Sequence, residues 1–150
     1  MSLNSVFALF GFPENENGNG ELKGEEMKDF KKSATFKIGM FKKLIRNGIL
    51  FKKQVVKFLS SSDIGFDVHG IDDAGDYMMY IRAYLWIKDF KFRSKEWKEA
   101  LFNYSDDEFI SLIKLSIKYF EENEEYERCA HLKKIQDLVD KNLKVINSQK

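Results

Sequence analysis

Apolar side chains recur every three or four residues through the C-terminal half of the chain, and this spacing restricts the fold more than any other feature. Between residues 77 and 139 only short polar segments interrupt the pattern. One of them, Ser105-Asp-Asp-Glu108, has the form of a capping box, in which side chains bond the free backbone N–H groups at a helix start. The sequence therefore predicts an all-α fold, a compact bundle of about five helices.

Polar segments divide this pattern into separate helices. We expect helices over residues 25–47, 49–59 and 77–90, a short one capped by Ser94, one after Glu108, and a last one from Tyr126 toward Lys150. Residues 105–147 should form an antiparallel helical hairpin, because the break between the last two helices is short. The helix over 77–90 is apolar nearly all round, which predicts that it is the central one.

Other segments of this region have patterns that predict a loop, a helix end or a strand. Residues 63–76 hold five Asp and three Gly, and we expect a loop there that ends by capping the next helix. Asn47-Gly48 suits a helix C-terminus. A strand over residues 35–41 is an alternative, because apolar and polar side chains also alternate in that stretch.

The length predicts one domain at residues 25–150, since 150 residues with 43% apolar side chains can build a core without disulfides or a metal. Residues 1–24 are predicted to be an N-terminal arm followed by a flexible loop rich in Asn and Gly. The arm carries Phe7, Phe10 and Phe12, with nothing nearby in the sequence to bury them. We expect these side chains to dock on the body or on another chain.

Charge and cysteine content favour an intracellular, cytoplasmic protein. The 25 basic and 24 acidic residues nearly cancel, so the overall charge does not point to a polyanionic partner. Cys129 is the single cysteine; it has no internal disulfide partner and is expected in the core. No apolar run has the length of a membrane span, and no signal peptide is recognisable.

Charges are distributed unevenly along the chain. Residues 28–57 hold nine Lys and one Arg against a single Asp, and residues 106–127 hold eight acidic residues. The basic segment could follow a phosphate backbone, with contacts from Lys42, Lys43, Arg46, Lys52 and Lys53. Alternatively, the charges are the solvated faces of two helices, or they support self-association of oppositely charged halves.

No residue pattern indicates catalysis. Asp67-Val68-His69 with Asp72, Asp73 and Asp76 contains potential metal ligands, but turn and capping roles explain these aspartates more simply. Cys129 and His131 are two residues apart on a predicted helix and point to different faces, so they cannot act as a nucleophile and base. We therefore predict no enzyme, cofactor, metal site or small-molecule substrate.

The last predicted helix resembles the UVR motif, the short helical hairpin of nucleotide-excision repair proteins, McsA regulators and some Clp ATPases. The matching residues are Glu125-Tyr126-Glu127, Cys129-Ala130 and Leu132-Lys133, within residues 107–142. Lys134 replaces an Asp of the family pattern, and Ile135 comes one residue early. The resemblance implies a protein–protein contact through Tyr126, Ala130 and Leu132, with Lys133 at the position of the family's Arg.

Together these features predict a protein–protein interaction or assembly module, as a homo-oligomer or as a small subunit or accessory factor of a larger complex. The candidate partner-binding residues are those of the arm and of the UVR-like segment: Phe7, Phe10, Phe12, Tyr126, Ala130, Leu132 and Lys133. The alternative is a nucleic-acid-associated accessory protein that uses the basic segment.

Overall fold

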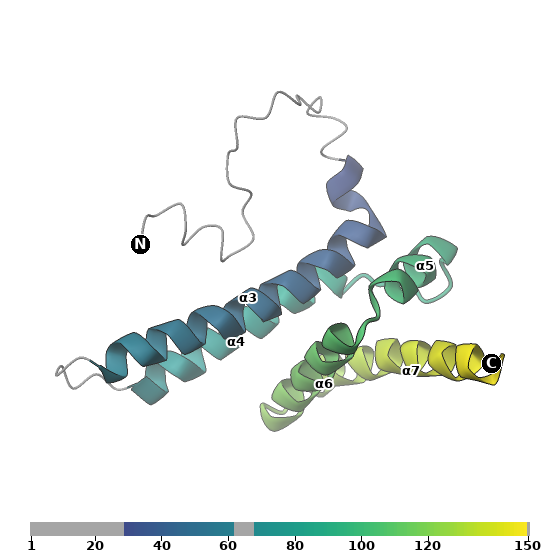
Figure 1. Ribbon diagram of the computed structural model, residues 1–150. Helices are drawn as coiled ribbons and strands as arrows, with labels where there is room; N and C mark the ends of the chain where they lie inside the picture. The colour runs from purple at the N-terminus through teal and green to yellow at the C-terminus, as the bar shows by residue number, and fades with distance from the viewer. Residues whose placement is uncertain (1–28, 62–67, 150) are drawn as a thin grey trace.

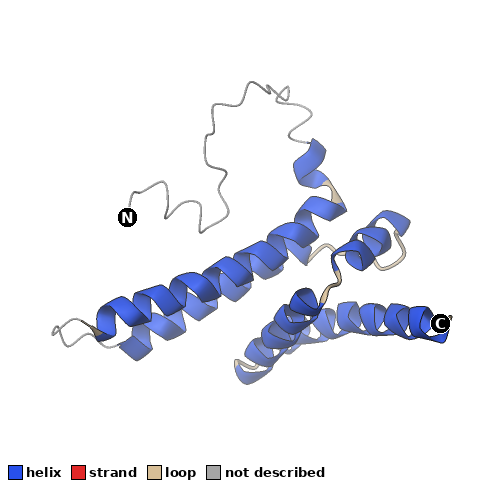
Figure 2. Ribbon diagram, viewed as in Figure 1, coloured by secondary structure: helices blue, strands red, loops and turns tan. Residues whose placement is uncertain are grey.

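A computed structural model of the chain describes residues 29–61 and 68–149, which form helices and turns without a strand (Figure 2). The predicted all-α class is confirmed, and the strand alternative over residues 35–41 is wrong. A helical stretch at 29–32 precedes five longer helices: α3 (Ala34–Ser60), α4 (Val68–Ile87), α5 (Lys95–Tyr104), α6 (Asp107–Glu122) and α7 (Tyr126–Ser148). Among the described helices, none is long and apolar enough to cross a bilayer.

The helices form two antiparallel pairs joined by α5 (Figure 1). α3 and α4 lie side by side and extend beyond the rest of the body, whereas α6 and α7 form the C-terminal hairpin on one side of them. In this hairpin the Cys129 Sγ lies 3.8 Å from the Ile117 carbonyl oxygen, and the Lys133 ammonium lies 4.0 Å from the Glu121 carboxylate, so both contacts connect α7 to α6.

Aromatic rings join the two pairs. Phe41 of α3 meets Phe109 of α6 edge to face, with ring centroids 5.9 Å apart. Tyr80 of α4 stacks on Tyr119 of α6 at 4.4 Å. Rings bury large areas and favour these offset and edge-on arrangements, so these aromatic contacts fix α3 and α4 against the hairpin.

One continuous helix, α3, replaces the two helices predicted over 25–47 and 49–59. It begins after Ser33, whose side chain accepts a hydrogen bond from the Phe36 N–H. Gly48 does not end it, because α4 passes so close that a Cβ at this position would lie 2.7 Å from the Met79 Cγ. A glycine read as a stop signal is here a point of close helix approach.

The helix α4 differs from its prediction in both length and burial. It begins at Val68, so the predicted loop over residues 63–76 is wrong for the part that follows Asp67. It is also not surrounded by other helices. Tyr80 and Ala83 are buried, but the side chains of Met78 and Leu85 are about half exposed, at 54% and 49%. An apolar helix thus leaves one side uncovered.

The predicted helix caps can be compared with the observed ones at the starts of α5 and α6. Ser94 caps α5 as predicted, accepting a hydrogen bond from the Trp97 N–H. The cap of α6 is Asp106 and not Ser105, one residue later than the capping-box pattern places it. The Asp106 carboxylate accepts from the Phe109 N–H at 2.8 Å and pairs with the Lys42 ammonium at 2.6 Å, which also ties α3 to α6.

The turn between α6 and α7 is a Schellman motif without glycine. The Glu125 N–H bonds the Phe120 carbonyl at 2.8 Å, and the Glu124 N–H bonds the Glu121 carbonyl at 3.2 Å. Glu124 has φ of 59°, the left-handed region in which glycine is the usual residue. The turn that closes the hairpin therefore carries backbone strain.

Replacing the cap of α6 should destabilise the fold. We expect Asp106→Ala to lower the free energy of unfolding by about 1–2 kcal/mol, because the Phe109 N–H loses its acceptor. Lys42 and the Phe109 N–H lower the pKa of Asp106, so this stabilisation is present above the ordinary carboxyl pKa and is lost as the pH falls through the lowered one. Urea unfolding at pH 7 measures the change.

Ser105→Ala is the matched control for this experiment, since Ser105 donates its hydroxyl to the Leu101 carbonyl and caps no helix start. An equal loss in the two variants would contradict the assignment of the cap to Asp106.

Relieving the strained turn should stabilise the fold. We expect Glu124→Gly to raise the free energy of unfolding by about 0.5 kcal/mol, because relief of the left-handed strain exceeds the entropy that glycine adds to the unfolded chain. Lys114→Gly, in the exposed interior of α6, should instead cost about 1 kcal/mol. Thermal or urea unfolding of both variants tests the difference, and a loss of stability in Glu124→Gly would refute it.

Candidate interaction surface

The five candidate phosphate-binding residues lie on α3, and three of them are paired within the molecule. The Lys42 ammonium contacts Asp106 at 2.6 Å, the Arg46 guanidinium lies 3.7 Å from Glu108, and the Lys52 ammonium bonds both carboxylate oxygens of Asp76 at 3.0 Å. Two residues of the basic segment 28–57 therefore pair with acidic residues of segment 106–127 within one molecule. Exposed ion pairs contribute little stability each, but they lower the net positive charge that a phosphate would meet.

The remaining two of the five, Lys43 and Lys53, are ten positions apart on α3, which places them about 80° from each other around the helix. Lys53 is exposed and Lys43 is half-buried. The structure thus brings no continuous strip of uncompensated cations together from this set.

The UVR-like candidates are divided between the inside and the outside of the hairpin. Leu132 is completely buried in the core, whereas Tyr126 is 63% exposed and Ala130 is exposed. Lys133 is exposed and lies 4.0 Å from Glu121 of α6. Leu132 therefore packs within the chain, and Tyr126, Ala130 and Lys133 are the members of this set that a partner could reach.

The potential catalytic and metal-binding residues do not form a site in the described part of the chain. Cys129 is buried, with its Sγ 3.8 Å from the Ile117 carbonyl oxygen. Among the described residues no group of three His, Cys, Asp or Glu side chains comes together. Asp67 and the side chains of His69 and Asp72 lie outside the described residues. The depression between α6 and α7 is lined by Phe109, Ile110, Ile113, Gln136, Val139 and Asp140, and it is too tight to hold a substrate.

The far half of the α3–α4 pair is apolar but has no buried core. Residues 46–60 of α3 include seven apolar side chains, and none of them is buried. The last buried residue of α3 is Ile45, and on α4 the first among the described side chains is Tyr80. Beyond these two residues, the α3–α4 pair extends past the end of α6 (Figure 1).

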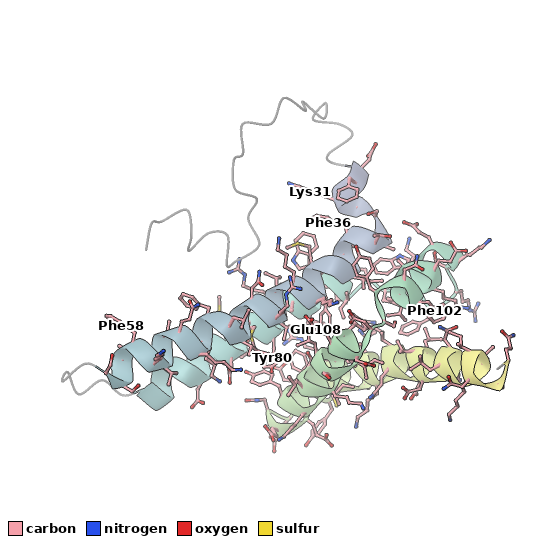
Figure 3. The ribbon with its side chains drawn as sticks, in the orientation of Figure 1. Lys31, Phe36, Phe58, Tyr80, Phe102 and Glu108 are labelled. Atoms are coloured by element: carbon pink, nitrogen blue, oxygen red, sulfur yellow. The ribbon has the colours of Figure 1, made fainter. Side chains whose placement is uncertain are left out.

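One side of this pair forms a continuous apolar surface. Gly48 faces α4, and Phe41 and Lys42 face α6, so helical geometry fixes the side of α3 that faces away from α6. Figure 3 shows Phe36 and Phe58 on that side, near opposite ends of α3, and Tyr80 on the side toward α6. We call this surface the outer face, and it consists of Phe36, Met40, Leu44, Phe51 and Phe58 of α3 with Met78, Leu85 and Trp86 of α4.

The outer face has the spacing of a helix-packing surface. Leu44, Phe51 and Phe58 are each seven residues apart, as are Met78 and Leu85, so that they line up along their helices. Exposure rises toward the far end, where 72% of Phe58 is accessible. A large ring exposed at the end of an aligned apolar row is typical of a surface that another chain segment covers.

The charged residues that border the outer face are basic in the described part of the chain. Lys43, Lys57 and Arg82 lie along it, and α3 contains no acidic residue at all. Within residues 74–86 of α4 the one acidic residue is Asp76, which pairs with Lys52 on the opposite side. The surface therefore favours an apolar segment that carries negative charge.

The arm residues Phe7, Phe10 and Phe12 lie outside the described residues. The outer face was not found from the sequence, because the prediction divided α3 into two helices, over residues 25–47 and 49–59, and so separated Leu44 from Phe58. The signal that could have found it is the heptad spacing of Leu44, Phe51 and Phe58.

Comparisons of the chain with protein-family models, with curated proteins and with solved structures find no significant match. The UVR resemblance therefore stays a prediction, and the function has to be argued from the surface itself.

His131 occupies a partly enclosed aromatic site between α7, α4 and the segment after α4. Its ring meets those of Tyr84 and Phe92 edge-on, each at 5.6 Å, and among the described residues its buried Nδ1 has no hydrogen-bond partner. Burial first, and then the positive charge of Lys134, lower the pKa of His131, while Asp89 raises it. The folded state therefore disfavours the imidazolium.

Stability should consequently fall when the solution is acidified from about pH 7 to pH 5. The unfolded chain takes up the proton first, near the ordinary histidine pKa of about 6.5, so the stabilisation is complete above that value and declines below it. We expect His131→Phe to flatten this dependence in urea unfolding at the two pH values. His69 is present in both proteins and cancels in the comparison; identical slopes would contradict the role of His131.

Proposed function

We propose that the protein is a non-enzymatic interaction module that works within an assembly, as a small subunit or accessory factor of a larger complex. The observation that carries this proposal is the outer face, an aligned apolar surface over α3 and α4 on which Phe58, Met78 and Leu85 are 72%, 54% and 49% exposed. In this half of α3, Leu50 and Phe58 are 48% and 72% exposed, and exposed side chains of this size favour packing against a partner.

The partner in this proposal is a helix or extended segment with apolar side chains and a negative charge. Phe58, Met78 and Leu85 supply the exposed apolar side chains that an amphipathic segment contacts. Lys43, Lys57 and Arg82 at the border select against a basic partner and increase the rate of association with an acidic one. The same border disfavours the pairing of two outer faces, because it would bring like charges together.

A photo-crosslinking residue placed at Phe58 tests the proposal in the full chain, expressed in the cells that make it. We expect covalent adducts with an apolar, acidic segment of another protein, identified by mass spectrometry. The matched control is Leu115, which is 42% exposed on α6, far along the chain from the outer face. Equal adducts at the two positions, or none at Phe58, would contradict the proposal.

The nucleic-acid alternative has less support, because Lys42, Arg46 and Lys52 are engaged with carboxylates. It predicts retention on DNA or RNA that weakens steeply with salt and is lost when the five candidate cations are changed to Gln. A shift of the absorbance ratio at 260 and 280 nm on the protein's own chromatographic peak would favour it.

A further inference from the structure

The chain itself contains an apolar segment followed by negative charge, which is the kind of segment that the outer face favours. Residues 6–12 are Val-Phe-Ala-Leu-Phe-Gly-Phe, five of them large and apolar, and residues 13–26 hold five Glu and one Lys. An apolar stretch followed by negative charge matches an apolar surface with a basic border. We propose that the N-terminal arm, residues 6–12, docks on the outer face of its own chain and competes there with the partner.

The point where the chain enters the described structure supports this path. Phe30 is 57% exposed, and its ring meets that of Phe36 edge to face at 5.4 Å. The ring of Phe36 in turn meets that of Trp86 at 5.5 Å. Phe36 and Trp86 belong to the outer face, so the residues that directly follow the arm and loop already lie against it.

The connecting segment is long enough for docking within one chain. Seventeen residue steps separate Phe12 from Asp29, and a fully extended chain of that length spans about 55–60 Å. The helix α3 has 27 residues, which corresponds to a length of about 40 Å. Every position along the outer face is therefore within reach of the arm.

Attachment to the same chain also favours the arm over a second molecule. A tethered segment has an effective concentration on the order of millimolar, which exceeds the usual concentration of a free partner. The alternative of two outer faces packed together meets repulsion between Lys43, Lys57 and Arg82 of each copy. The arm avoids this repulsion because its neighbouring charges are predominantly acidic.

Disulfide formation in the full chain tests where the arm docks. Ala8→Cys is combined with Gln54→Cys, an exposed position of α3 on the same side as the outer face. The control combines Ala8→Cys with Lys53→Cys, the adjacent exposed position, which is turned by about 100° around the helix. Cys129 stays unchanged because it is buried.

We expect the 8–54 disulfide to form several-fold faster than the 8–53 disulfide and to leave the mass of the protein monomeric. Equal rates for the two pairs would show that the arm does not dock on the outer face. A product of twice the mass would show that the arm docks on another copy. Either outcome overturns the proposal.

The claim of competition rests on the proposed function, and a separate measurement distinguishes the two. Changing Phe7, Phe10 and Phe12 to Ser should raise the yield of partner adducts at Phe58 several-fold, because the arm no longer occupies the surface. A preferred 8–54 disulfide without adducts in this variant would refute the proposed function and leave arm docking intact. Adducts with no disulfide preference would refute arm docking alone.

Discussion

The organisation of this protein follows from the point at which its packed core ends. Rings of α6 pack against the near half of α3 and α4 through the contacts of Phe41 with Phe109 and of Tyr80 with Tyr119. Beyond Ile45 no side chain of α3 is buried, although the sequence remains apolar. Because removing apolar area from water is favourable, this half of the pair is where we propose that a further segment packs.

Charge acts in the same region but in a different way. The basic residues that face α6 and α4 are tied to carboxylates, as in the pairs of Lys42 with Asp106 and Lys52 with Asp76. Such pairs contribute more to the register of the helices than to stability. The basic residues on the opposite side border the outer face instead. The same helix thus uses positive charge for internal ion pairs on one side, and in our proposal its charge on the other side selects the occupant of the outer face.

The arm and the outer face give one account of two features of the sequence that are otherwise unrelated. Phe7, Phe10 and Phe12 have no apolar neighbours beyond their own short segment in the sequence, and the far half of α3 has no fully buried side chain. An intramolecular occupant also keeps such a surface from associating nonspecifically until a partner arrives, since a large exposed apolar surface is an aggregation hazard. In this proposal the side chains of the outer face bind the partner, and the arm limits the partner's access by covering the same side chains.

The sequence by itself determined the helical class, the cap at Ser94 and the C-terminal hairpin, because these depend on local spacing and on side chains that bond nearby backbone groups. It also predicted Leu132 as a packing residue, but not whether it packs inside the chain or against a partner. Only the tertiary structure decided that Gly48 lies within α3, that Asp106 caps α6, and that one side of α4 is uncovered. Local pattern shows which residues are apolar; which of them are covered depends on the lengths and crossing of helices that are distant in sequence.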